Sequence, residues 1–87
     1  MKPVTVESLS SPGCHNCKAF EEYFETIKSH FPNVTYRNIS ILSPEGMEMA
    51  AKYSIFASPG IVINGELFST GGIDKDKFLE KIKQSSQ

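Results

Sequence analysis

The 87-residue chain has no tryptophan, only two cysteines and no excess of charge of either sign. Its 9 basic and 10 acidic residues are mixed along the chain and give a net charge of -1, which leaves no basic stripe for phosphates and no polybasic patch for membranes. No segment approaches the ~20 apolar residues of a membrane span, and the amino-terminal MKPVTVESLS lacks the apolar run of a signal peptide. We therefore expect one domain, residues 1–87, that works in the cytoplasm without nucleic acid or membrane partners.

Both cysteines lie in one short stretch, SPGCHNCKAF, residues 11–20. Two cysteines are too few for a disulfide scaffold, and a bridge across so short a loop removes little entropy from the unfolded chain. A structural zinc site needs four ligands, but His15 lies between the thiols and His30 lies far along the same predicted helix. We expect a redox pair, Cys14 and Cys17, and no metal; a metal bridging two chains through the same cysteines stays open.

Three stretches have the features of helices. Apolar residues recur at helical spacing from residue 18 to 31, and Ser43-Pro44 and Asp74 are typical of helix starts. The residues expected to face the core are Phe20, Tyr23, Phe24, Ile27 and Phe31 in the first helix, Met47, Ala50 and Ala51 in the second, and Phe78, Leu79 and Ile82 in the third. Gly46 is expected to weaken the second helix.

Four stretches have the composition of β-strands. Residues 4–9 end at the turn SSPG, and residues 34–41 form a second strand, in which we expect a break of register near Asn38. Residues 60–63 and 66–69 flank Asn64-Gly65, a strong hairpin signal. The order is β-α-β-α-β-β-α, which predicts an α/β fold with a mixed sheet of four strands flanked by helices. Right-handed crossover makes the first two strands parallel neighbours, so the cysteines lie at the carboxyl end of the first strand.

The position of the cysteines predicts their chemistry. A helix start has unpaired N–H groups and about half a positive charge, which stabilises a thiolate there. The pKa of Cys14 should fall from ~8.5 into the range ~3.5–7.5, which makes Cys14 the nucleophile and the more shielded Cys17 the resolving thiol. His15 and Lys18 could favour the thiolate, or could be ordinary exposed side chains; the sequence leaves both open.

The combination of CHNCK after a first strand and SPGIVINGELFSTGG before a last helix resembles the thioredoxin and glutaredoxin superfamily, most of all its small glutaredoxin-sized members. The resemblance implies that Pro59 is cis and lies against the active-site disulfide, and that Ser58 offers its backbone to a substrate peptide. Gly72 falls in a segment similar to the one that receives a glutathione carboxylate in glutaredoxins. Gly13 and His15, on either side of Cys14, are the other expected substrate contacts.

The resemblance implies a thiol-disulfide oxidoreductase that exchanges disulfides with proteins or small molecules. It would need no metal or organic cofactor, and its electrons would come from a thioredoxin reductase-like enzyme or from glutathione. The buried acid that thioredoxins have beneath the site has no clear counterpart, since the nearby candidates are Glu7 and Ser8. The alternative is a non-enzymatic binding module or redox sensor with the same fold, including a metal-bridged dimer through the cysteines.

Overall fold

The computed structural model describes all of residues 1–87. Its elements follow the predicted order, with one short 3-10 helix, η1, added after the first α-helix. They are β1 (Val4–Ser10), α1 (His15–Ile27), η1 (Lys28–His30), β2 (Val34–Ser40), α2 (Pro44–Tyr53), β3 (Gly60–Ile63), β4 (Glu66–Thr70) and α3 (Lys75–Ser85). No helix has both the length and the apolar character needed to cross a membrane.

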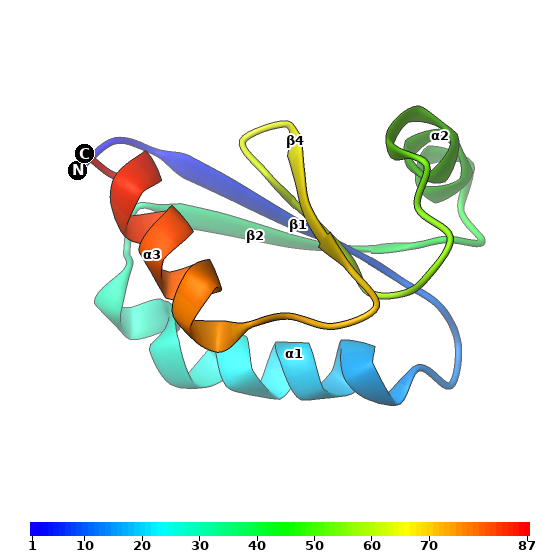
Figure 1. Ribbon diagram of the computed structural model, residues 1–87, viewed down its shortest axis with the longest axis horizontal. Coiled ribbons are helices and arrows are strands. Elements are labelled where there is room, and N and C mark those ends of the chain that lie inside the picture. Colours follow the sequence, from blue (N-terminus) through cyan, green and yellow to red (C-terminus); the bar gives the residue numbers. More distant parts are fainter.

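The strands form one mixed sheet in the order β2-β1-β3-β4 (Figure 1). β1 and β2 are parallel, with Val4 opposite Val34 and Ser10 opposite Ser40, whereas β3 is antiparallel to β1 and β4 is antiparallel to β3. Asn64 and Gly65, with φ of 50° and 78°, have the left-handed backbone that the tight turn between β3 and β4 requires. The predicted mixed sheet and hairpin are confirmed.

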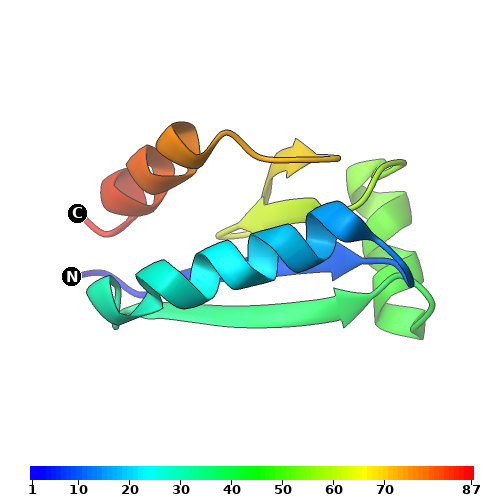
Figure 2. The ribbon, with the colours of Figure 1, turned by 90° about the horizontal axis from the view of Figure 1, so that it is seen from below.

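Helices cover both faces of the sheet (Figure 2). One core lies between the sheet and the helices α1 and α3, and a second lies between the sheet and α2. The first core contains Val4, Val6, Phe20, Phe24, Ile61, Ile63, Phe78 and Ile82, and the second contains Leu9, Ile39, Met49, Ile55 and Val62. Strand β1 contributes residues to both cores because its side chains alternate between the two faces of the sheet. On the α1 face, Val4 and Val6 are followed by Ser8.

One expectation about β2 and one about α2 were wrong. The register of β2 does not break at Asn38, because the parallel pairing continues through Ser8–Asn38 to Ser10–Ser40. The core-facing side of α2 contains Gly46, Met49 and, as expected, the partly buried Ala50, whereas Met47 is 57% exposed and Ala51 is exposed. The helical phase of so short a segment depends on where its first turn meets β2, which the sequence pattern does not reveal.

Gly46 has a role that its helix propensity hides. It is buried at the first turn of α2, and a Cβ atom there would overlap the carbonyl oxygen of Ser40 at the end of β2. Its N–H donates to the Oγ of the N-cap Ser43 at 2.9 Å. The glycine therefore permits the close approach of helix and strand, which outweighs its weakening of the helix as an isolated segment.

We predict that Gly46→Ala lowers the free energy of unfolding by about 1–2 kcal/mol, because the overlap with backbone exceeds the ~1 kcal/mol that alanine adds in helix propensity. Urea denaturation followed by circular dichroism measures the change. Gly72→Ala is the matched control, since a Cβ there meets no atom within 4 Å. A Gly46→Ala protein at least as stable as the parent would contradict the steric account.

Candidate active site

The turn between β1 and α1 determines where Cys14 lies. β1 ends at Ser10, and the N–H of Cys14 donates to the carbonyl of Ser11 at 3.3 Å to close a tight turn. Gly13, with a φ of 71°, has the left-handed backbone that side chains disfavour. This turn leaves Cys14 at the N-cap of α1, where its Sγ accepts a hydrogen bond at 3.1 Å from the N–H of Cys17. The sulfur of Cys14 thus occupies the anion position of the helix start.

The two cysteines are joined by a disulfide and differ in exposure. Their Cα atoms lie 5.3 Å apart, one turn along the helix. Cys17 is buried, with 5% of its surface exposed, whereas Cys14 is partly exposed. No acidic residue lies in the first turn of α1, so no carboxylate there opposes a thiolate at its start. A reagent arriving from solvent therefore meets Cys14 first.

Pro59 and Ser58 lie on the β3 side of the disulfide. The Ser58–Pro59 peptide bond is cis, and Pro59 is buried. The Ser58 hydroxyl donates to Cys14 Sγ at 3.4 Å, so the Ser11 hydroxyl, 2.7 Å away, is the donor to Ser58. The Ser58 hydroxyl thus faces the sulfur of Cys14, and the Ser11 hydroxyl lies behind it. The sequence singled out Ser58 for its backbone and gave no sign of this side-chain contact.

The loop between β4 and α3 also reaches the site. Asn16, between the cysteines, donates from its Nδ2 to the carbonyl of Gly71 at 2.7 Å, and the N–H of Gly71 donates to the carbonyl of Pro59 at 3.0 Å. Asn16 was not predicted as a site residue, and Gly71 only as part of the glutaredoxin-like segment Gly71–Asp74. Their contact spans 55 positions of sequence, which local patterns do not reveal. Gly72 follows in this loop, is exposed, and has open space where a Cβ would lie.

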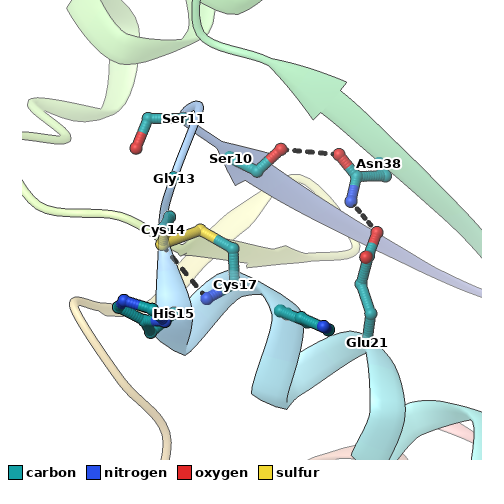
Figure 3. Close-up of a pocket in the computed structure, with 9 residues that line it drawn as sticks. Ser10, Ser11, Gly13, Cys14, His15, Cys17, Glu21 and Asn38 are labelled. Atoms are coloured by element: carbon teal, nitrogen blue, oxygen red, sulfur yellow. Dashed lines mark hydrogen bonds between the residues drawn. A yellow bond between two sulfur atoms is a disulfide. The ribbon is translucent and has the colours of Figure 1, made fainter.

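A cavity of about 560 Å³ opens on the β2 side of the cysteines (Figure 3). Its lining residues are Ser10, Ser11, Gly13, Cys14, His15, Cys17, Lys18, Glu21 and Asn38. A chain of hydrogen bonds borders it: Ser10 Oγ donates to Asn38 Oδ1 at 2.7 Å, and Asn38 Nδ2 donates to the Glu21 carboxylate. Asn38 and Glu21 were missed by the sequence analysis, although the parallel register with β1 brings Asn38 to the carboxyl end of the sheet.

The position beneath the site holds no acid. Ser8 is fully buried on the α1 face, and its hydroxyl has no hydrogen-bond partner. Glu7 belongs to the opposite face, where its carboxylate pairs with Arg37 at 3.2 Å, and Arg37 also pairs with Glu45 at 2.8 Å. Of the two candidates from the sequence, Ser8 lies on the α1 face but is not an acid, and Glu7 is an acid but lies on the opposite face of the sheet.

Tyr36 lies on the α1 face of β2, close to this polar border. Burial raises the pKa of its phenol above the usual 10.0; contacts with the side chains of Ser8 and Asn38 oppose the rise, and the charges of Glu21 and Glu25 add to it. Tyr36 is therefore a neutral phenol near pH 7. It adds no negative charge beside the cysteines.

The histidines occupy different surroundings. His15 is exposed and lines the cavity beside Cys14, while His30 is exposed in η1 at the other end of α1. The two are not brought together, and no group of three or more His, Cys, Asp or Glu side chains is arranged to hold a metal ion. Lys18 is exposed and lines the cavity next to Cys17.

A redox-active cysteine pair at the start of the first helix, beside a cis-proline that precedes the third strand, defines the class of thiol-disulfide oxidoreductases with a thioredoxin fold. Comparison with known proteins gives the family. Residues 4–84 match the family model described as "Thioredoxin domain", and the chain belongs to that family. It is 33% identical over 87 residues to the thioredoxin of Methanocaldococcus jannaschii, covering 97% of this chain and 98% of that protein. The protein is a dithiol-disulfide oxidoreductase that uses the Cys14–Cys17 pair.

Solved structures agree with the fold. Thioredoxin NaTrxh from Nicotiana alata superimposes with a TM-score of 0.78 at 19% identity, covering 100% of this chain and 76% of that one. The thioredoxin of Malassezia sympodialis gives a TM-score of 0.72 at 25% identity, covering 99% of this chain and 77% of that one. The chain therefore spans about three quarters of the length of these structures. The family model and the curated relative are both thioredoxins, so they support the thioredoxin part of the expected resemblance more directly than the glutaredoxin part.

We predict that Ser58→Ala raises the apparent pKa of Cys14, measured by alkylation in reduced protein, by about one unit. The loss of a hydrogen bond to a charged group costs ~1.5–3 kcal/mol and one pKa unit corresponds to ~1.4 kcal/mol, with the lower end expected at a partly exposed sulfur. Ser11→Ala should cause a smaller rise, because it removes only the donor to Ser58. Ser29→Ala, an exposed serine in η1, is the control, and an equal pKa in all four proteins would refute the contact.

Proposed function

We propose that Cys14 is the attacking thiol and Cys17 the resolving thiol. The observation that supports this order is the difference in position: Cys14 is partly exposed at the helix N-cap, and Cys17 is 5% exposed one turn further along. The Cys14 thiolate attacks one sulfur of a substrate disulfide, which forms a mixed disulfide and releases the other sulfur as a thiolate. Cys17 then attacks Cys14 Sγ and releases the second substrate sulfur, so two electrons pass to the substrate.

The substrate contacts that we propose surround Cys14. An extended peptide lies beside Ser58 and Pro59 and uses the backbone of Ser58 as a neighbouring strand would. Gly13 leaves space in front of Cys14, because it has no side chain there, and His15 borders the entrance from the helix side. Gly72 provides a further contact from the loop that Asn16 attaches to the site. Protein disulfides, which extend past the cysteine on both sides, fit these contacts best.

We infer that a separate reductase of the thioredoxin reductase type returns electrons to the disulfide, with glutathione as the other candidate donor. The family membership supports the first, and the likeness of the Gly71–Asp74 segment to glutaredoxins supports the second.

The chemistry uses the cysteine pair alone, without a metal or an organic cofactor. We propose the cytoplasm as the compartment, because a reducing pool returns the pair to its dithiol form there, and one thioredoxin-like domain over residues 1–87.

The order of attack predicts which cysteine captures a partner. Cys17→Ser should accumulate mixed disulfides through Cys14, because the resolving thiol is absent. Cys14→Ser should accumulate few, since its remaining thiol is buried. Non-reducing electrophoresis with a disulfide-bonded model protein as substrate measures both. Capture mainly by the Cys14→Ser protein would reverse the assignment, and capture by neither would oppose exchange with protein disulfides.

A further inference from the structure

The resolving step requires Cys17 to lose a proton in a place that disfavours a thiolate. Its side chain is 5% exposed, and burial opposes the charged form of any thiol. Ser8, on the α1 face of the strand that leads to the cysteines, carries no charge, and the Glu7 carboxylate pairs with Arg37 on the other face of the sheet. The proton acceptor must therefore be sought elsewhere among the groups that surround Cys17.

The cavity on the β2 side supplies one candidate. Glu21 is the only carboxylate among its lining residues, and it follows Cys17 by four positions in α1, so both side chains lie on the same face of the helix. Figure 3 shows how these two lining residues lie: Cys17 is turned toward Cys14, and Glu21 extends from the helix toward Asn38. The cavity that both residues line has a volume of about 560 Å³, which is room enough for a water molecule.

The position of the Glu21 side chain is fixed by the sheet. Asn38 of β2 donates its Nδ2 to the carboxylate, and Asn38 in turn accepts from Ser10 Oγ at the end of β1, 2.7 Å away. The carboxylate therefore keeps its place at the border of the cavity. Its second oxygen accepts no hydrogen bond from the protein, and so remains open to a proton donor.

The charged and titratable groups around Glu21 are compatible with a proton acceptor. In α1 these are His15, Cys14, Cys17 and Lys18 along the cavity and Glu25 one turn further on, and in β2 the neighbour is Tyr36. Lys18 brings a positive charge to the cavity next to Cys17, where it favours the developing thiolate. Tyr36 stays neutral near pH 7 and does not compete for the proton.

We propose that Glu21 is the proton acceptor for Cys17 in the resolving step. The inference rests on the proposed order of attack. It assigns to Glu21 the proton transfer that Ser8 of β1, which is not an acid, cannot perform. The thiol proton of Cys17 passes to the carboxylate, directly or through one water, as the Cys17 sulfur bonds to Cys14 Sγ and the bond from Cys14 to the substrate breaks. The departing substrate thiolate then takes up a proton from Glu21 or solvent, so that no charge is left over.

The test separates the two chemical steps by rapid mixing of reduced protein with a peptide whose disulfide carries a fluorescent reporter. Formation of the mixed disulfide is measured in the Cys17→Ser background, and its resolution in the protein with both cysteines. The substitution is Glu21→Gln, which keeps an oxygen for Asn38 but removes the base. The matched control is Glu22→Gln, an equal loss of charge at the adjacent, exposed position of α1.

We expect Glu21→Gln to slow resolution about a hundredfold at pH 6.5, the lower end of the range known for positioned general bases, and to leave the first step within about twofold. The difference should shrink toward pH 9, where hydroxide removes the proton without help. Asn38→Ala should slow resolution less, because the carboxylate is kept but no longer held. Glu22→Gln should match the parent protein in both steps.

Two outcomes would overturn the assignment of Glu21. One is a resolution rate in Glu21→Gln equal to that in Glu22→Gln across the pH range. The other is an equal slowing of both steps, which would make the side chain a structural support of the helix start. A parent protein that forms the mixed disulfide but never resolves it would instead oppose the proposed function itself, so the two failures are distinguishable.

Discussion

The unpaired N–H groups at the start of α1 are the constraint on which the site depends. The tight turn after β1, possible because Gly13 has a φ of 71°, directs the chain so that Cys14 becomes the N-cap of that helix. From there its sulfur accepts the N–H of Cys17 and meets the partial positive charge of the helix. The helix begins at the carboxyl end of the parallel strands β1 and β2, and Cys17, one turn further into the helix, is buried.

The two sides of the cysteine pair have different chemical character. On the β3 side, Ser58 presents its hydroxyl to Cys14 and is itself hydrogen-bonded to Ser11, and Asn16 attaches the loop at Gly71. This side offers donors and backbone, which suit an extended substrate and an attacking thiolate. On the β2 side, Glu21 borders an open polar cavity next to Cys17. The hydroxyl of Ser58 thus meets Cys14, whereas the carboxylate of Glu21 lines a cavity that both cysteines share.

Much of the fold could be predicted from the sequence, because strand composition, helix caps and the Asn64-Gly65 turn are local signals. The cysteine pair and Pro59 were also predicted, from the motif and the family resemblance. Contacts between distant segments could not be predicted: Gly46 faces Ser40 across a helix–strand junction, and Asn16 meets Gly71 across 55 positions. Glu21 is not among the core-facing residues that helical periodicity identifies, and periodicity does not show that the end of β2 reaches it through Asn38.

The most direct test of the account is the pH dependence of Cys14 alkylation in the reduced protein, with Cys17→Ser to assign the signal to one thiol. A helix start that stabilises the thiolate predicts an apparent pKa below ~7.5. An apparent pKa at or above ~8.5, the value of a free cysteine, would contradict the stabilisation of Cys14 and favour a binding module over an exchange enzyme.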